Sequence, residues 1–192
     1  DLGKIVIPNL VGVDIGCGMY VESLGTDTID LRGLDQAVHE IPSGFKSWRN
    51  PISTADFMRK LISYKALKTD VIEIQIGTSG GGNHFIEIDE DSDSGEKYLV
   101  IHSGSRNIGK QVADHYQKLA ERTCTADVPR DLKYLTGEPA KAYLHDMALC
   151  QQYAALNRSV MGEVITDYLG RSGKSFQTIH NFIHPDDIII RK

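Results

Sequence analysis

Residues 77–106 read GTSGGGNHFIEIDEDSDSGEKYLVIHSGSR, and this stretch decides the fold that the sequence predicts. Residues 83–88 alternate between apolar and polar side chains as a strand does, and residues 98–102 form a second apolar run. The acidic, serine-bearing segment between them is typical of an exposed connection. We therefore predict an antiparallel pair of strands, with His84 directly after one glycine-rich loop and His102 directly before another, so that the two imidazoles lie near each other.

Helical patterns dominate the rest of the chain. Residues 139–168 give the strongest one, with apolar side chains recurring near one face, and weaker patterns cover residues 28–64 and the stretch after residue 106. Residues 5–21 read as strand, tight loop and strand, and residues 175–184 as a strand that carries histidines. Strands and long helices mixed in this way, without alternating strand–helix units, favour an α+β fold over a doubly wound sheet.

Length and composition indicate one globular domain. The 192 residues suffice for one sizeable hydrophobic core, and 41% hydrophobic and 24% charged residues are ordinary for such a domain. No apolar run is long enough to cross a bilayer and the first residues do not resemble a secretory signal, so we expect a cytoplasmic protein without a membrane partner. Both ends of the sequence look cut, as in a fragment of a longer protein.

Charge and cysteine usage narrow the chemistry. The net charge of −5 gives no general support for nucleic-acid binding, so an RNA partner would need a local basic patch. The three cysteines are an odd number at wide spacings, which suits a reducing compartment rather than a disulfide framework. A cysteine with a function here would therefore act as a thiolate.

Five residues could together bind metal ions. Asp14 and Cys17 lie three apart in a glycine-rich turn, while His84, His102 and His180 lie at strand ends or in an apolar strand. Each has a plainer interpretation, since Asp14 could cap a turn, Cys17 could be a small buried hydrophobe, and a histidine on an apolar strand is often a satisfied core residue. Jointly they supply enough ligands for two ions if the thiolate bridges them.

A second candidate site is an anion site beside these ligands. Ser103, Ser105 and Arg106 precede a predicted helix and offer hydroxyls, amides and a guanidinium to a phosphate, although Ser105 could simply cap that helix. The glycine run before His84 would let a phosphate approach main-chain amides closely. The remaining histidines and cysteines have helical or loop positions or lack ligand neighbours, and we set them aside: His39, His115, His145, His184, Cys124 and Cys150.

Four motifs in this order resemble the signature motifs of the RtcB RNA ligases. They are VGVDIGCGM at 11–19, Gly77-Thr78 with GNHFIEI at 82–88, HSGSR at 102–106 and HNF at 180–182, and YAALNR at 153–158 adds to the match. The resemblance implies the family's mixed sheets with packed helices, truncated relative to the family, and makes residues 1–192 a single domain, the central metal-binding part of an RtcB-like catalytic domain. Asn107 stands where relatives commonly have Gly.

The resemblance also implies a site and an activity. It assigns two manganese ions to Asp14, Cys17, His84, His102 and His180, with the thiolate bridging. It places the guanylate of GTP near Asn83, Phe85, Glu87 and Asn181, and an RNA phosphate near Arg106. The implied activity is the GTP- and manganese-dependent joining of an RNA 3′-phosphate, or 2′,3′-cyclic phosphate, to a 5′-hydroxyl, in tRNA splicing or RNA repair, and it leaves room for a protein activator.

No catalytic nucleophile can be assigned within this chain. The histidine that the family guanylylates lies in a later motif, and no histidine of this sequence matches that motif. We therefore expect residues 1–192 to bind metal without completing ligation alone. Two alternatives remain open, namely a two-metal phosphoesterase that hydrolyses with the same ligands, and a non-catalytic paralogue that binds metal or RNA.

Overall fold

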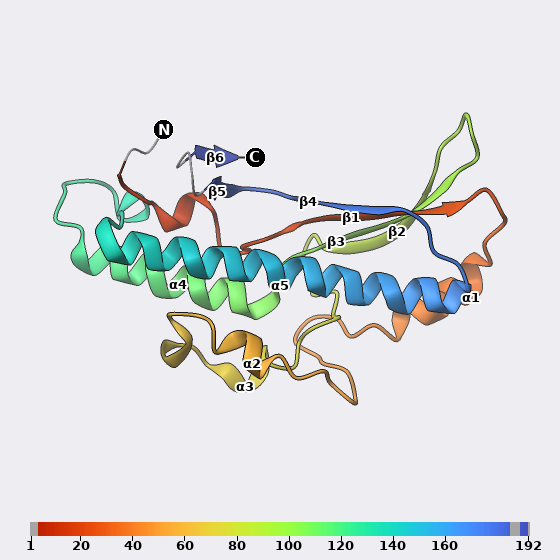
Figure 1. Cartoon of the computed structure of the whole chain (residues 1–192), viewed down its shortest axis with the longest axis horizontal. Helices are drawn as coiled ribbons and strands as arrows, with labels where there is room; N and C mark the ends of the chain where they lie inside the picture. The colour runs from red at the N-terminus through yellow and green to blue at the C-terminus, as the bar shows by residue number, and fades with distance from the viewer. Residues whose placement is uncertain (1–3, 185–188, 192) are drawn as a thin grey trace.

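The computed structural model of the chain describes residues 4–184 and 189–191. An antiparallel four-stranded sheet in the order β2-β3-β1-β4 has helices packed along one of its faces (Figure 1). Its strands are β1 (Gly18–Gly25), β2 (Phe85–Glu90), β3 (Lys97–Ser103) and β4 (Ser175–Ile179). The helices are α1 (Leu31–His39), α2 (Ala55–Met58), α3 (Thr69–Ile72), α4 (Arg106–Thr123) and α5 (Gly137–Leu169), with 3-10 turns η1 (Pro8–Leu10), η2 (Tyr64–Ala66) and η3 (Arg130–Leu132). This mixture agrees with the predicted α+β class.

The predicted strand pair forms one side of the four-stranded sheet, with β2 at the edge. β2 and β3 pair antiparallel with Phe85 opposite His102, and β3 also pairs with β1. Leu99 and Ile101 of β3 point towards the helices and are fully buried, while Ile86 of β2 packs against the same core from the edge. The pairing brings the imidazoles of His84 and His102 to a ring separation of 5.6 Å, which confirms the predicted proximity.

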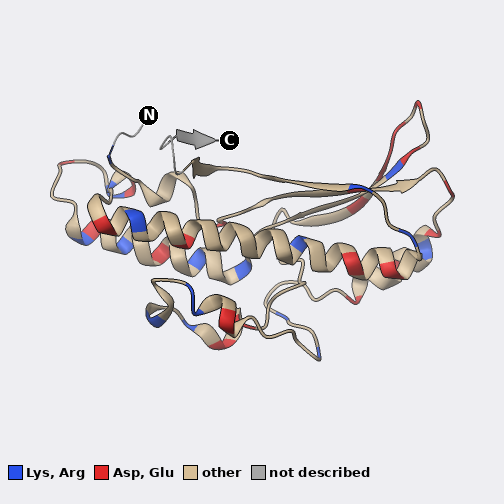
Figure 2. Cartoon of the chain, viewed as in Figure 1, with Lys and Arg blue, Asp and Glu red and all other residues tan. Residues whose placement is uncertain are grey.

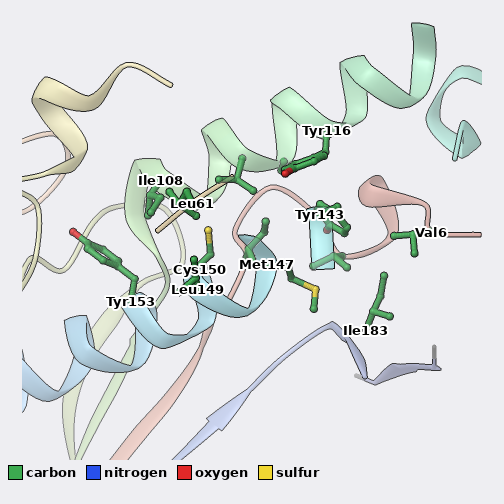
Figure 3. Packing of buried hydrophobic residues seen from close by; sticks show 14 of the residues in the cluster. Val6, Leu61, Ile108, Tyr116, Tyr143, Met147, Leu149, Cys150, Tyr153 and Ile183 are labelled. Atoms are coloured by element: carbon green, nitrogen blue, oxygen red, sulfur yellow. The ribbon is translucent and has the colours of Figure 1, made fainter. Parts of the chain in front are cut away.

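Helix α5 joins two apolar cores. At a rise of 1.5 Å per residue its 33 residues extend about 50 Å, longer than one packing partner can cover. Its first half packs on α4, with Tyr143 in edge-to-face contact with Tyr116 and the Cys150 thiol inside the same cluster (Figure 3). Its last part, including Met161 and Ile165, packs under the sheet. The helix thus crosses from one core to the other in its middle.

Two predicted elements were wrong in detail. Residues 5–21 contain one strand, not two: Val6 forms an isolated bridge to Leu135, and Pro8, which lacks an N–H for a ladder, starts the 3-10 turn η1. The predicted strand over residues 175–184 is broken between β4 and the short β5 (Phe182–His184), because Asn181 has a left-handed backbone with φ of 51°.

Two further features concern the ends and the long helix. Near the C-terminus, Ile189–Arg191 forms β6, which pairs with β5, while residues 185–188 and 192 lie outside the described residues. Leu156, one of the apolar residues in the helical pattern over residues 139–168, is 47% exposed, and the polar residues that follow it, Asn157 and Arg158, are buried.

Among the described residues no helix combines the length and apolar character needed to cross a bilayer. Lys and Arg are interspersed with Asp and Glu along α4 and α5 (Figure 2). A polyanionic ligand would therefore have to rely on a local basic group.

Candidate metal centre

The loop before β1 presents Asp14 and Cys17 together. It turns tightly, because the Cys17 amide donates to the Asp14 carbonyl at 3.1 Å. The Asp14 carboxylate lies against Gly104, where a Cβ atom would come within 2.1 Å of Oδ1, so the glycine after Ser103 makes room for it. The Cys17 carbonyl accepts a hydrogen bond from the His180 amide at 2.8 Å, which fixes the end of β4 beside the thiol.

Asp14, Cys17 and His84 form one group of candidate ligands. His84 Nε2 lies 2.9 Å from Asp14 Oδ2 and 4.0 Å from Cys17 Sγ. The other ring nitrogen, His84 Nδ1, lies 3.0 Å from the Ser79 carbonyl, to which it can donate. Such a bond to the second nitrogen selects the tautomer in which Nε2 offers its lone pair to a metal.

Cys17, His102 and His180 form the other group. Cys17 Sγ lies 3.0 Å from His102 Nε2, and the rings of His102 and His180 are 5.4 Å apart and perpendicular. In both groups the ligand atoms lie within 4.8 Å of one another, and Cys17 belongs to both. A sulfur shared between two sets of ligands is the geometry that a bridging thiolate requires.

The ionisation of these groups favours metal over proton only in part. Burial and the charges of His84 and His180 keep the pKa of His102 below its usual value, so its imidazole is neutral at pH 7. Burial would raise the pKa of Asp14, but the hydrogen bond and charge of His84 outweigh it, and the carboxyl pKa lies below its usual value. Burial and the Asp14 carboxylate raise the pKa of Cys17 to about 12, so a metal must displace the thiol proton.

The donor set fits transition-metal dications. Calcium and magnesium prefer all-oxygen ligands, whereas a thiolate and three imidazoles with one carboxylate suit softer ions. The residues present can hold two such ions, one in each group, because Cys17 belongs to both groups.

A cleft opens directly beside the ligands. It has a volume of about 320 Å³, and its lining includes Asp14 and His84 together with Arg106, Lys110 and Phe45. Phe45 is 86% exposed. The cleft therefore combines two candidate metal ligands, two cations and an accessible aromatic ring in one place.

Arg106 is held in this cleft in a strained backbone conformation. Its φ is 60°, a left-handed value that costs a non-glycine residue on the order of 1 kcal/mol or more and often marks a functional site. Its Nε donates to Thr78 Oγ1 at 2.9 Å, and a Cβ on Gly80 would lie 2.0 Å from its Nη1. The alternative in which Ser105 caps α4 is wrong, since its hydroxyl donates to the Ile15 carbonyl and makes no cap bond.

Comparison with known proteins identifies the family. The family model described as "tRNA-splicing ligase RtcB" matches residues 53–187 of the chain. The chain belongs to the RtcB family. It is 32% identical to the "RNA-splicing ligase RtcB" of Escherichia coli over 196 residues, which cover 85% of this chain and 47% of that protein.

A second relative extends the comparison to archaea. The chain is 29% identical to the "tRNA-splicing ligase RtcB" of Nanoarchaeum equitans over 212 residues, covering 81% of this chain and 44% of that protein. The chain thus spans about half the length of the RtcB relatives that it matches.

The residues that the RtcB resemblance places near guanylate come from two segments of the chain. Asn83, just before β2, and Phe85 and Glu87 on β2 are exposed, and the Phe85 ring lies 5.1 Å from that of His102. Asn181 lies between β4 and β5, and its Nδ2 donates to the carbonyls of Leu10 and Val11 at 3.4 Å. Within the described residues, Arg106 and Asn181 are the non-glycine residues with positive φ, and both were predicted site residues.

The histidines and cysteines that the sequence set aside also lie outside both ligand groups, as far as the described residues go. His39 contacts the Asp35 carbonyl, His145 contacts Asp146, and Cys150 is buried in the core of α4 and α5.

The sequence did not predict the role of two residues of α5 that contact the ligand-bearing segments. Asn157 and Arg158 are fully buried and contact several ligand-bearing segments. The only signal available was the YAALNR resemblance, because the helical pattern around it predicts core packing.

Proposed function

We propose that this chain is the metal-binding part of an RNA ligase that joins an RNA 3′-phosphate, or 2′,3′-cyclic phosphate, to a 5′-hydroxyl with GTP and two manganese ions. RtcB relatives named as RNA-splicing and tRNA-splicing ligases support the ligase class. The observation that carries the proposal is the Cys17 sulfur shared by two ligand groups. Two-metal centres of this kind serve phosphoryl-transfer chemistry.

The ligands divide the work between two ions. In the proposal Asp14 and His84 would hold one ion, His102 and His180 would hold the other, and Cys17 would contribute its sulfur to both. Manganese would supply Lewis acidity to phosphate oxygens and a template for the reacting groups. The protein's own contribution is to fix the ligands and to keep the His84 lone pair pointed at the centre through Ser79.

The cleft beside the centre would receive an RNA end. Arg106 would bind a phosphate, with Lys110 as a second cation, because guanidinium and ammonium groups make charge-assisted hydrogen bonds to phosphate oxygens. The exposed ring of Phe45 would stack on a base, a contact that tolerates any sequence. These residues supply the local basic group that the net charge of −5 makes necessary.

GTP would lie on the open face of β2. Asn83, Phe85 and Glu87 would contact the guanylate there, with the Glu87 carboxylate accepting hydrogen bonds from donors of the base. Asn181, between β4 and β5, would contact the guanylate as well. We assign no catalytic nucleophile to residues 1–192. The chain as a single domain would therefore provide metal binding within a larger RtcB-like catalytic unit.

One assay separates the proposal from its alternatives. The full protein containing this chain is incubated with Mn²⁺, GTP and an RNA that has a 5′-hydroxyl and a radiolabelled 3′-phosphate. Ligation would place the label inside a joined strand, where phosphatase cannot remove it. Release of the label as free phosphate would instead indicate a two-metal phosphoesterase, and neither outcome in a metal-loaded protein would indicate a non-catalytic paralogue.

A further inference from the structure

We infer that Asn157 and Arg158, in the middle of α5, are positioning residues that tie together the chain segments carrying the metal ligands. This inference rests on the proposed two-metal function. Both side chains are fully buried at the point where α5 crosses between its two apolar cores. A buried amide and a buried guanidinium are costly unless their hydrogen-bonding groups find partners, so their contacts indicate what they stabilise.

Arg158 connects three of these segments. Its Nη1 donates to the Gly16 carbonyl at 2.9 Å and to the Ser103 carbonyl at 2.7 Å. Gly16 directly precedes Cys17, and Ser103 directly follows His102. Its Nε donates to Gln177 Oε1 at 2.9 Å, on β4 three residues before His180. One planar guanidinium thus contacts the segments of three ligands.

Asn157 connects a fourth segment, the glycine loop that precedes His84. Its Oδ1 accepts from the Thr78 amide at 3.1 Å and its Nδ2 donates to the Thr78 carbonyl at 3.0 Å, as a strand neighbour would. Nδ2 also lies 3.3 Å from Ser103 Oγ. That hydroxyl donates to the Ser79 carbonyl at 2.9 Å, the same carbonyl that His84 Nδ1 contacts. The amide of Asn157 therefore links the glycine loop of His84 to the end of β3.

The contacts suit positioning because they reach the main chain directly beside the ligands, at the ends of strands that the sheet pairs. The ligand segments come from sequence positions far apart, and their ligand atoms must still lie within 4.8 Å of one another. Hydrogen bonds from α5 fix carbonyls next to the ligands, so the helix adds a second set of restraints to the ligand distances that the sheet pairing defines. The fork of Arg158 reaches two carbonyls and an amide at once, which the single ammonium of a lysine cannot reproduce.

The test uses Co²⁺ binding as a spectroscopic readout in the full protein. The thiolate charge-transfer band reports whether Cys17 binds the ion, and the ligand-field bands report the geometry of the site. We expect Arg158→Lys to fold, as judged by circular dichroism, and to bind Co²⁺ about 10- to 100-fold more weakly with shifted ligand-field bands. Arg158→Met should lower the Co²⁺ affinity further, because it removes the positive charge together with the Nε and Nη1 donors.

The matched control is Asp146→Asn, an equally buried charged residue of the same helix that contacts no ligand segment. It should lower the melting temperature while leaving Co²⁺ affinity and spectrum unchanged. If Arg158→Lys fails to fold, Gln177→Met keeps the test decisive, since it removes one contact of the fork. If the folded variant, Arg158→Lys or Gln177→Met, keeps the wild-type Co²⁺ affinity and spectrum, the inference is overturned and the proposed function is not affected. A wild-type protein that binds no Co²⁺ would overturn the proposed function, and the inference with it.

Discussion

Helix α5 carries two buried charges that do similar physical work in different places. Asp146 accepts hydrogen bonds from the amides of Ile62 and Ser63 at 2.8 and 2.9 Å and from the Tyr116 hydroxyl at 2.9 Å. Arg158, three turns further on, donates to carbonyls and an amide of three segments. In both cases a charge is solvated by groups from distant parts of the chain, which fastens those parts to the helix.

The difference lies in what is fastened. Asp146 holds the loop after α2 against α4, where no ligand group lies among the described residues. Arg158 holds the loops of Cys17 and His102. The same device therefore stabilises the fold at one point of α5 and shapes a reactive centre at another, and the two roles can be separated by measuring stability and metal binding on the same variants.

The largest expected effect follows from removing the shared ligand. Cys17→Ala should weaken the binding of both ions by more than about 100-fold. A direct ligand contributes more to metal affinity than the residues that orient it. Metal content after dialysis against Mn²⁺ measures this. Cys150→Ala is the matched control, a buried cysteine in the apolar core that should affect stability and leave the metal content intact. Loss of one ion only would mean that the sulfur does not bridge.

The next effect tests how much Asp146 contributes to the stability of the fold. Asp146→Asn should lower the free energy of unfolding by about 2 kcal/mol, because the amides of Ile62 and Ser63 and the Tyr116 hydroxyl lose hydrogen bonds to a charged acceptor. Urea unfolding followed by circular dichroism measures the change. An unchanged unfolding midpoint would show that this buried charge holds nothing together.

A pH dependence should distinguish the metal centre from the rest of the molecule. Because the pKa of Cys17 is about 12 without metal, its thiol is protonated between pH 7 and 9, and binding must release that proton. The apparent affinity should therefore rise about tenfold per pH unit in this window. The neutral imidazole of His102, whose pKa is lowered, adds nothing to this slope. Calorimetry in buffers of different ionisation enthalpy measures the protons released, and a pH-independent affinity would contradict thiolate ligation.

The smallest effect tests a single hydrogen bond, from the Tyr116 hydroxyl to Asp146. Tyr116→Phe removes one donor to Asp146 while keeping the ring that packs edge-to-face on Tyr143, so we expect a loss of about 1 kcal/mol in unfolding free energy. Metal affinity measured on the same sample should stay at the wild-type value. A drop in affinity would mean that the two halves of α5 are coupled after all.

The sequence predicted what local patterns encode. The β2–β3 pair and α5 follow from alternation and helical periodicity, and the five proposed ligands stood out because metal-binding side chains lay beside glycines or at strand ends. The break at Asn181 could not be predicted, because a left-handed asparagine looks like any other polar residue in a strand.

The roles of Asn157 and Arg158 were hidden for a different reason. In the helical pattern, polar residues next to Leu156 indicate the solvent face, yet the structure buries them and exposes Leu156. Their partners come from segments that only the folded chain brings together. Long-range polar contacts of this kind leave no periodic signal.

The most direct test of the central claim is anomalous diffraction at the manganese edge from crystals of the Mn²⁺-loaded protein. We predict two peaks on either side of Cys17 Sγ, one beside Asp14 and His84 and the other beside His102 and His180. A single peak, or peaks away from the sulfur, would contradict the bridged two-metal centre.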